Sequence, residues 1–567
     1  MNLFRTYWRP TLIFLLLLSI FLTNAFHEKY PDEFDSIVGG RYITEGKLPY
    51  RDWFQHHQPG AYVMAATILP FSGQSFVKFR IGWEVMLFAM LVGSYFLLKA
   101  RLPKRDISFY LVLLFVLGIS ATYFWGHMLL ADTLAGYFML PAFALLFLKD
   151  YYREKFGATD LVIVGWFAFL SWFTSMTYIF IVVALSLYAL YLFIATNTQK
   201  AVFMRLLHGI GLLAVPYVVF GLYLLLSGSI KDYYWANVVY NTNYYIYNYP
   251  HEPGAPINPI RYAAVIFDTF INNYTLAVWG AKEFPLSNPV QVTIAFSSVV
   301  AIILVILRKR WLFLFPLLTT LIFSNARSNP QSIRETDYQA FVYIITSMFN
   351  GLFSLWAIRE LIDEEKVAFS KKITLSLLFM ALTLYWIATP IYFVMKMEQK
   401  FFPKYMGKLP LIYDRPQVAP YINAIVSPDD LVFIGPFEFE ELFYLHTKRQ
   451  PSKYHWFLNH AATSKIKDEL IEDLSRNRPK IVVFNRGFAP WGGDATTYNW
   501  WMSDFLDEHY FRLFSLNETL TDKQYRWKIG KTENFDIDGM FNFDKRYQAE
   551  LLDKMISLGY IEVIPGK

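Results

Sequence analysis

Long apolar runs separated by short charged linkers are the main pattern of the chain up to about residue 395. A helix needs roughly 20 mostly apolar residues to cross the hydrocarbon core of a bilayer, which is about 30 Å thick. About eleven runs approach that length, and we interpret each one as a transmembrane helix. They cover residues 10–26, 81–98, 107–124, 131–148, 160–175, 177–195, 207–226, 290–307, 311–324, 340–358 and 373–395.

The linkers between these runs alternate in charge. Lysine and arginine recur in every second linker, as in residues 99–105, 149–155, 308–310 and 359–372. The positive-inside rule places these basic linkers in the cytoplasm. The segments that then lie on the extracytoplasmic face are residues 27–80, 125–132, 227–287 and 325–338, together with everything after the last run.

Two stretches leave the number of spans open. The run at 311–324 is short, and residues 260–281 are apolar despite Arg261 and Asp268. We interpret residues 260–281 as an interfacial or re-entrant helix, because a twelfth span would disturb the charge alternation after it. Arg5 and Arg9 before an apolar core also resemble a signal peptide, but the charge alternation favours a first helix that is retained.

From residue 396 onward the sequence is charged, punctuated by proline and without a further span. Residues 431–434 and 481–484 have the composition of buried strands, and helical spacing occurs in residues 416–426, 438–447, 465–477 and 498–508. Strands that alternate with helices indicate a small α/β domain. Two roles stay open for this domain: recognition of an acceptor substrate, or lid-like packing.

The predicted fold is therefore a polytopic α-helical membrane protein with a small soluble domain. Residues 1–395 form the transmembrane domain of about eleven helices, with interfacial helices in its first outer loop. Residues 396–567 form the extracytoplasmic α/β domain.

Composition agrees with a membrane protein and excludes several function classes. Hydrophobic residues make up 55% of the chain and charged residues only 17%, which excludes a single soluble core. No cysteine is present, so disulfides, thiolate metal sites and cysteine nucleophiles are excluded. The net charge of +6 is small, and no basic run interleaved with aromatic residues resembles a nucleic-acid groove. Nucleic acid is not an expected partner.

Acidic side chains gather where the first apolar run ends. Asp32, Glu33 and Asp35 lie within four residues, and ionisable groups at membrane depth are expensive and usually functional. The spacing that follows predicts an interfacial helix, on which adjacent side chains point about 100° apart. Only one of Asp32 and Glu33 can aim at a given atom, and Asp32 is the first choice as general base. The alternative is that these acids only stabilise the first turn of the helix.

Asp132 is a second acid, at the entrance of an otherwise apolar run. Placing a carboxylate in such a run costs about 2.5–3.5 kcal/mol, which points to a function. We expect Asp132 to face the first acid across a cavity, where it orients the acceptor or helps to hold a divalent cation. The alternative is a plain helix N-cap.

Histidine and arginine residues on the same face are candidates for binding a phosphate group. His56 and His57 are expected to diverge, which argues against a shared metal ion, so one of them is a candidate for a phosphate or sugar contact. Arg334, and less strongly Arg327, suits phosphate oxygens because a guanidinium is a forked donor. Snorkelling of either arginine to the lipid headgroups is the alternative.

Four further residues are candidates for substrate contacts: Asp35, Arg51, Gln58 and Tyr244. Asp35 is also a candidate for a solvated acid or an ion-pair partner of Arg41. Tyr244 belongs to a loop dense in aromatic residues, on which sugar faces stack, although tyrosine and tryptophan also collect at bilayer interfaces.

Acids on the outer face have a limited choice of donor, because nucleotide-bound donors are not available there whereas lipid-phosphate donors are. Transfer from a polyprenyl-phosphate sugar needs a carboxylate to take the acceptor proton and cations to stabilise the departing phosphate. The outer segments of this sequence contain both.

In their order and spacing these motifs resemble the GT-C membrane glycosyltransferases, in particular the enzymes grouped with protein O-mannosyltransferases and lipid A aminoarabinose transferases. Pro31-Asp-Glu33 resembles the Asp-Glu pair of that family, whose first acid is taken as catalytic. The stretch from Gly46 to Gly60 resembles the Gly-x-x-Pro-Tyr-x-Asp and His-x-Pro-Gly motifs that follow. Asp132 corresponds to a second acidic position, and Arg334 resembles more loosely an arginine that binds the lipid phosphate. Gln58 departs from a lysine that the family often has there.

The resemblance implies transfer of a sugar from a polyprenyl- or dolichyl-phosphate carrier, usually with inversion, to a lipid, glycan or protein acceptor. Asp32 is then the general base, and Arg334 offsets charge on the departing phosphate. The implied location is the plasma or inner membrane, with the active site outside.

Two other function classes stay open. A transporter or flippase of lipid-linked saccharides would distribute ionisable residues at mid-depth through several spans, whereas most of those here cluster at the outer ends. A polysaccharide polymerase or ligase would also use outer arginine and aspartate residues, but would not be expected to place an Asp-Glu pair directly after its first helix.

Overall fold

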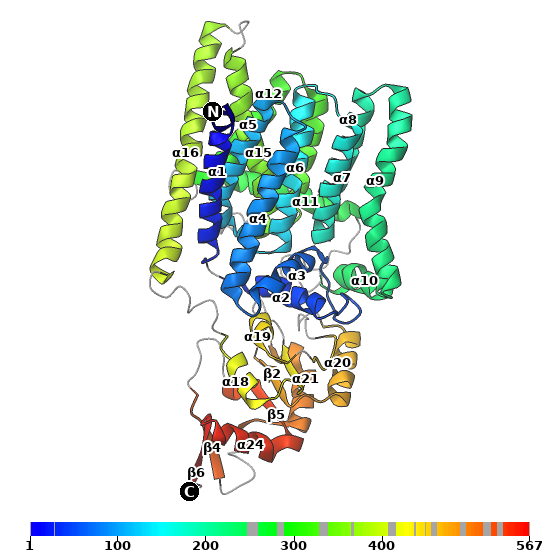
Figure 1. The fold of residues 1–567 in the computed structure, drawn as a ribbon, viewed down its shortest axis with the longest axis vertical. Coiled ribbons are helices and arrows are strands. Elements are labelled where there is room, and N and C mark those ends of the chain that lie inside the picture. The colour runs from blue at the N-terminus through cyan, green and yellow to red at the C-terminus, as the bar shows by residue number, and fades with distance from the viewer. Residues whose placement is uncertain are drawn as a thin grey trace.

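A bundle of helices and a smaller part that contains the strands make up the structure (Figure 1). The structure, a computed structural model, describes residues 2–27, 29–245, 259–279, 289–327, 338–363, 368–405, 416–435, 438–447, 449–454, 462–487, 495–513, 523–529 and 537–565. The helices of the bundle are α1 (Asn2–Asn24), α4 (Phe76–Lys99), α5 (Lys104–Ser120), α6 (Ala131–Tyr151), α7 (Ala158–Thr174), α8 (Ile179–Thr196), α9 (Gln199–Leu226), α11 (Pro259–Trp279), α12 (Pro289–Leu307), α13 (Trp311–Phe323), α15 (Phe341–Asp363) and α16 (Phe369–Tyr405).

Every one of the predicted apolar runs falls on a helix of this bundle. Within the described residues, five helices are long and apolar enough to cross a membrane, and a sixth span arises if the bent pair Gly211–Leu226 and Ile230–Tyr245 is counted as one. Several apolar helices thus indicate a membrane-embedded helical protein. The number of eleven spans stays a prediction. Helix α16 continues through Tyr405, beyond the predicted end at residue 395.

Helices α6 and α15 lie in the centre of the bundle. In their apolar stretches 94% and 89% of the residues are buried, against 11% in α16. A Cβ atom at Gly136 of α6 would lie 2.8 Å from Cδ1 of Ile345, so this glycine allows close approach of the two helices. Helix α16 instead exposes apolar side chains such as Leu377 and Leu384 along one face, as a lipid-facing helix does.

Three short helices lie across one end of the bundle, next to the strand-containing part: α2 (Pro31–Thr44), α3 (Gly60–Ser72) and α10 (Ile230–Tyr234) (Figure 1). Helix α2 occupies the stretch for which an interfacial helix is predicted. Two glycines bring α2 against α3, because a Cβ at Gly39 would lie 2.4 Å from Cδ1 of Tyr62 and one at Gly40 would lie 2.5 Å from Cβ of Ala65. Short segments at the same end are η1 (Ala121–Phe124), η2 (Met176–Tyr178), the π-helix η3 (Trp235–Tyr245) and η6 (Tyr338–Ala340).

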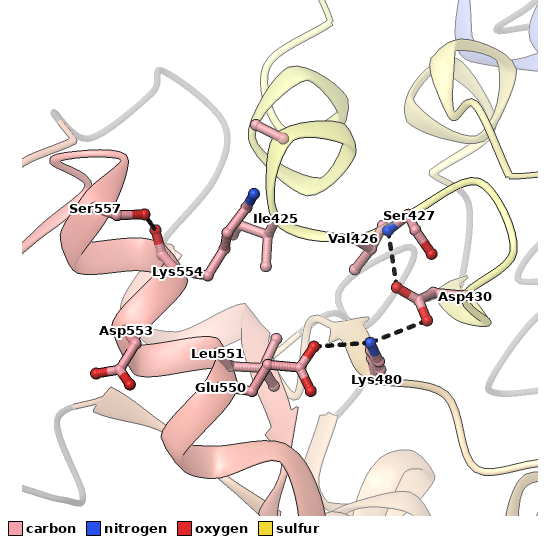
Figure 2. A pocket seen from close by; sticks show the side chains of 11 residues that line it. Ile425, Val426, Ser427, Asp430, Lys480, Glu550, Leu551, Asp553, Lys554 and Ser557 are labelled. Carbon is pink, nitrogen blue, oxygen red and sulfur yellow. Dashed lines mark hydrogen bonds and ion pairs between the residues drawn. The ribbon is translucent and has the colours of Figure 1, made fainter.

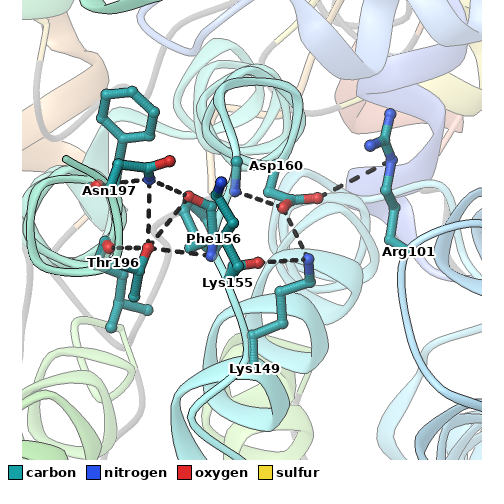
Figure 3. Close-up of polar contacts among 10 residues, drawn as sticks. Arg101, Lys149, Lys155, Phe156, Asp160, Thr196 and Asn197 are labelled. Atoms are coloured by element: carbon teal, nitrogen blue, oxygen red, sulfur yellow. Dashed lines mark hydrogen bonds and ion pairs between the residues drawn. The ribbon is translucent and has the colours of Figure 1, made fainter. Parts of the chain in front are cut away.

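Paired polar side chains close the opposite end of the bundle, where the basic linkers lie. The buried carboxylate of Asp160 accepts hydrogen bonds from Nζ of Lys149 and from the backbone N–H of Gly157, both at 2.8 Å, and Arg101 lies 3.9 Å away (Figure 3). The Nδ2 atom of Asn197 donates to the carbonyl oxygen of Phe156 at 2.8 Å. These contacts fasten the linker between α6 and α7 to its neighbours, which indicates a structural role.

The smaller part combines a four-stranded sheet, in the order β1-β2-β5-β3, with a two-stranded sheet of β4 and β6. The parallel pair β1 (Val432–Gly435) and β2 (Ile481–Phe484) coincides with the two predicted strands, and Val432 lies opposite Ile481. The other strands are β3 (Tyr510–Phe511), β4 (Lys523–Trp527), β5 (Phe541–Asp544) and β6 (Ile561–Pro565). The helices of this part are α18 (Ala419–Ile425), α19 (Phe439–Tyr444), α20 (Ser464–Arg476), α21 (Ala495–His509), α23 (Ile537–Met540), η9 (Lys545–Tyr547) and α24 (Gln548–Ser557).

Candidate functional site

Asp32 lies in the first turn of α2 and is half-buried. Its Oδ2 atom accepts a hydrogen bond of 2.5 Å from the hydroxyl of Tyr338, in η6 directly before α15. Tyr338 also packs in a small apolar cluster with Met128 and Leu130, which precede α6. Asp32 is therefore held at the point where α2, α15 and the entrance of α6 meet.

Asp132 lies two residues beyond this cluster, in the first turn of α6, and is only 1% exposed. Its Oδ1 atom accepts a hydrogen bond of 2.7 Å from the hydroxyl of Tyr178. Its Oδ2 atom lies 3.3 Å from Nη1 of Arg327, just after α13. The carboxylate is thus more than a helix cap, because side chains from two other segments converge on it.

Glu33, adjacent to Asp32, points into the protein and is fully buried. Its Oε1 atom accepts a hydrogen bond of 2.5 Å from Nε of Arg80 in α4 and lies 3.4 Å from the backbone nitrogen of Leu129. Burial raises the pKa of Glu33, and the Arg80 guanidinium opposes that shift. This placement favours a positioning role for Glu33, which ties α2 to α4 and to the segment before α6, over direct contact with a substrate.

Glu84 is a further buried acid, one helical turn after Arg80. Neither of its carboxylate oxygens has a hydrogen-bond partner among the described residues. Two buried histidines lie in the same region, since the ring centroids of His27 and His127 are 5.3 Å apart. The indole nitrogen of Trp83 donates to the carbonyl oxygen of His127 at 3.0 Å, which fixes the segment before α6 on α4.

Asp35 accepts two hydrogen bonds, from Nε2 of Gln55 at 3.1 Å and from the hydroxyl of Tyr62 at 3.0 Å. Burial raises the pKa of Asp35 to about 7, and the negative charge of Asp32 adds to the rise. The predicted pairing of Asp35 with Arg41 is wrong. Nε of Arg41 binds Glu45 at 2.8 Å instead, because these residues are four positions apart on the helix.

His56 and His57 contradict the expectation that their rings diverge. The ring centroids lie 4.0 Å apart, because the backbone is neither helical nor extended here and bends at His57. The ring of Tyr245, in η3, lies 4.7 Å from that of His56. Burial, with the charge of Arg327 as a second cause, lowers the pKa of His57 to about 3. Both histidines therefore border the region of Arg327, and His57 is neutral at physiological pH.

The other predicted substrate contacts lie at the edge of this region. Nε2 of Gln58 donates to the hydroxyl of Tyr233 at 2.9 Å. Tyr244 is 41% exposed on the π-helix η3, an element that is rare and often found at functional sites. Arg51 pairs with the neighbouring Asp52, with 2.7 Å between Nε and Oδ1. Arg334 lies outside the described residues.

Four side chains that organise this region were missed by the sequence reasoning: Tyr338, Tyr178, Arg80 and His127. Arg80 left a usable signal, because an arginine directly before an apolar run calls for a buried acidic partner. The two tyrosines left none, since their partners are distant in the sequence.

No metal site forms within the part of the chain that the structure describes, because nowhere do three histidine, aspartate or glutamate side chains come together as possible ligands. No protein-family model matches the chain, and no curated protein matches it either.

A separate pocket of about 660 Å³ lies between α18 and α24 (Figure 2). Lys480 bridges two acids on its wall, with 3.1 Å to Asp430 and 3.0 Å to Glu550, so these charges satisfy one another. None of the predicted site residues lines it. We therefore place the candidate site at the end of the bundle that carries α2.

Proposed function

We propose that this protein is a glycosyltransferase that moves a sugar from a polyprenyl-phosphate donor to an acceptor hydroxyl at the extracytoplasmic face of the membrane. The observation that carries the proposal is that two acids are held beside the segment before α6: the half-buried Asp32, and the buried Asp132, which pairs with the half-buried Arg327. A glycosyl transfer from a lipid phosphate needs a proton acceptor and a cation within one site.

In the proposed reaction the acceptor oxygen attacks the anomeric carbon, and the bond from that carbon to the phosphate oxygen breaks. The hydroxyl proton passes to the carboxylate of Asp32, which is accessible enough to meet an acceptor because it is half-buried. The leaving phosphate gains one negative charge. Attack from the side opposite the phosphate gives inversion at the anomeric carbon.

Among the residues that the structure describes, Arg327 is the candidate for the cation that offsets the new charge on the phosphate. Its side chain is 21% exposed, so it retains access to a ligand while one nitrogen faces Asp132. Asp132 orients this guanidinium, and the hydroxyl of Tyr178 orients Asp132. Arg334 remains the first choice from the family resemblance and would act in the same way.

Purified protein, incubated with a panel of polyprenyl-phosphate sugars and with membrane extract as acceptor source, tests the proposal through release of the carrier phosphate. We expect release with at least one donor, and a loss of about 10²–10⁴-fold in Asp32→Asn, the contribution typical of a general base. Asp429→Asn is the matched control, because the side chain of Asp429 is 85% exposed in the strand-containing part. Absence of release with every donor, or normal turnover by Asp32→Asn, would contradict the proposal.

A further inference from the structure

We infer that the strand-containing part is a positioning element for α2, and that α19 holds α2 from both sides of Asp32. This inference rests on the proposed function, in which Asp32 is the base. It assigns Arg41 and Lys29 as positioning residues on the α2 side and Glu440 as their counterpart on the α19 side.

Arg41 forms the first of the two connections, near the end of α2. Its Nη1 atom donates to the carbonyl oxygens of Leu442 and Phe443, at 3.1 and 3.0 Å, and its Nη2 atom donates to that of Thr447 at 3.4 Å. The last carbonyls of a helix have no partner within the helix, so Arg41 supplies donors that the end of α19 lacks. The Arg41 side chain is only 13% exposed, as expected for a contact that excludes water.

Lys29 forms the second connection, three residues before Asp32. Its ammonium group pairs with the carboxylate of Glu440, in the first turn of α19. Phe34 lies between the two connections, and its ring centroid is 6.1 Å from that of Phe443. The six-residue helix α19 therefore spans the stretch of chain that carries Asp32.

Helix α19 is itself fastened within the strand-containing part. The carboxylate of Glu441 accepts hydrogen bonds from the backbone N–H groups of Gln417 and Ala419, both at 2.6 Å, at the start of α18. A further connection reaches the loop between α2 and α3, since the N–H of Phe54 donates to the carbonyl oxygen of Lys453 at 2.9 Å. The strand-containing part is thus connected both to this loop and to α2.

The consequence for catalysis follows from the position of Asp32. A shift of about 1 Å in a reacting group lowers a rate by about 10²-fold, even when the protein remains folded. If the contacts of α19 set the position of α2, their loss lowers kcat more than it changes the KM for the donor, because the acid is displaced while Arg327 is not.

Charge exchange at the Lys29–Glu440 pair tests this inference in the full-length protein. Lys29→Glu and Glu440→Lys each place like charges in contact, and we expect kcat to fall about tenfold in each with KM changed less than about twofold. The double variant restores the attraction and should recover at least half of the wild-type kcat. Glu562→Lys is the control, because it breaks an ion pair with Arg526 on the β4–β6 sheet, away from α19, and should leave kcat unchanged.

A readout that does not depend on activity uses the absence of cysteine from the chain. The variant Lys29→Cys/Glu440→Cys carries two thiols, and a short thiol-specific bifunctional reagent should join them within one molecule. The cross-link tests only whether α19 lies against the start of α2. Failure of the wild-type protein to release carrier phosphate would instead contradict the glycosyltransferase proposal. Active wild-type protein with unchanged kcat in both single variants, or a double variant no better than the singles, overturns the positioning role.

Discussion

Glu33 and Asp32 are adjacent acids for which the structure predicts opposite effects on substitution. Both oxygens of Glu33 face the Arg80 guanidinium, and both side chains are fully buried. Glu33→Gln leaves the Arg80 charge in the interior without its main counter-charge. Asp32→Asn leaves a half-buried side chain whose remaining amide oxygen still accepts the hydrogen bond from Tyr338.

The expected magnitudes separate the two variants. Removing one partner of a buried ion pair costs about 3–5 kcal/mol of stability, because the other charge is left uncompensated. Weakening one partly exposed hydrogen bond costs about 1 kcal/mol. We therefore expect Glu33→Gln to lower the stability by about 3–5 kcal/mol and Asp32→Asn to lower it by no more than about 1 kcal/mol. Carrier-phosphate release per folded molecule should instead fall more in Asp32→Asn than in Glu33→Gln.

Thermal unfolding in detergent, followed by tryptophan fluorescence, measures the stability of each variant. Arg80→Gln and the double variant Glu33→Gln/Arg80→Gln complete a double-mutant cycle. The double variant should lose less stability than the sum of the two singles, because it leaves neither charge of the pair behind. The reasoning is refuted if Glu33→Gln is as stable as the wild type while Asp32→Asn unfolds early.

The remaining predictions concern packing, the second acid and pH. Gly40→Ala should lower stability by about 1–3 kcal/mol through overpacking of α2 on α3. Gly93→Ala, with open space around its Cβ position inside α4, should not lower it in the same unfolding assay. Tyr178→Phe removes the hydroxyl that donates to buried Asp132 and should cost about 1.5–3 kcal/mol; an unchanged unfolding temperature would rule that bond out as a stabilising contact. Folding raises the pKa of Asp35 from its ordinary 3.8 to about 7, so between these pH values the folded chain keeps a proton that the unfolded chain loses. The contribution of Asp35 to folding stability is therefore complete below about pH 3.8 and is lost as the pH rises to about 7. Asp35→Asn should flatten that slope in unfolding measured between about pH 4 and about pH 8, and an identical slope would show that another group is responsible.

Local patterns in the sequence predicted the helices and strands. They did not predict the side-chain contacts, because these join residues that are far apart in the chain. The apolar runs fall on helices and the β1–β2 pair matches the two predicted strands, because burial imposes its period on neighbouring residues. The partner of Glu33 is 47 positions away and that of Asp32 is 306 positions away, so no spacing in the chain encodes either contact. The error at His56 and His57 has a different cause, since regular backbone geometry was assumed where the chain bends.

Under the proposed function, the balance of charge at the candidate site limits where the donor phosphate would bind. Among the described residues of the site, the carboxyl groups are Asp32, Glu33, Asp35, Glu84 and Asp132, and the guanidinium groups are Arg80 and Arg327. Arg80 is buried against Glu33 and has no access to a ligand, and His57 is neutral because burial lowers its pKa to about 3. Of these groups, Arg327 is thus the cation that can meet an anion, and the half-buried carboxylate of Asp32 repels a phosphate from its own side. The donor phosphate should therefore approach from the Arg327 side, which leaves the side of Asp32 to the neutral hydroxyl of the acceptor, the arrangement that inverting transfer requires.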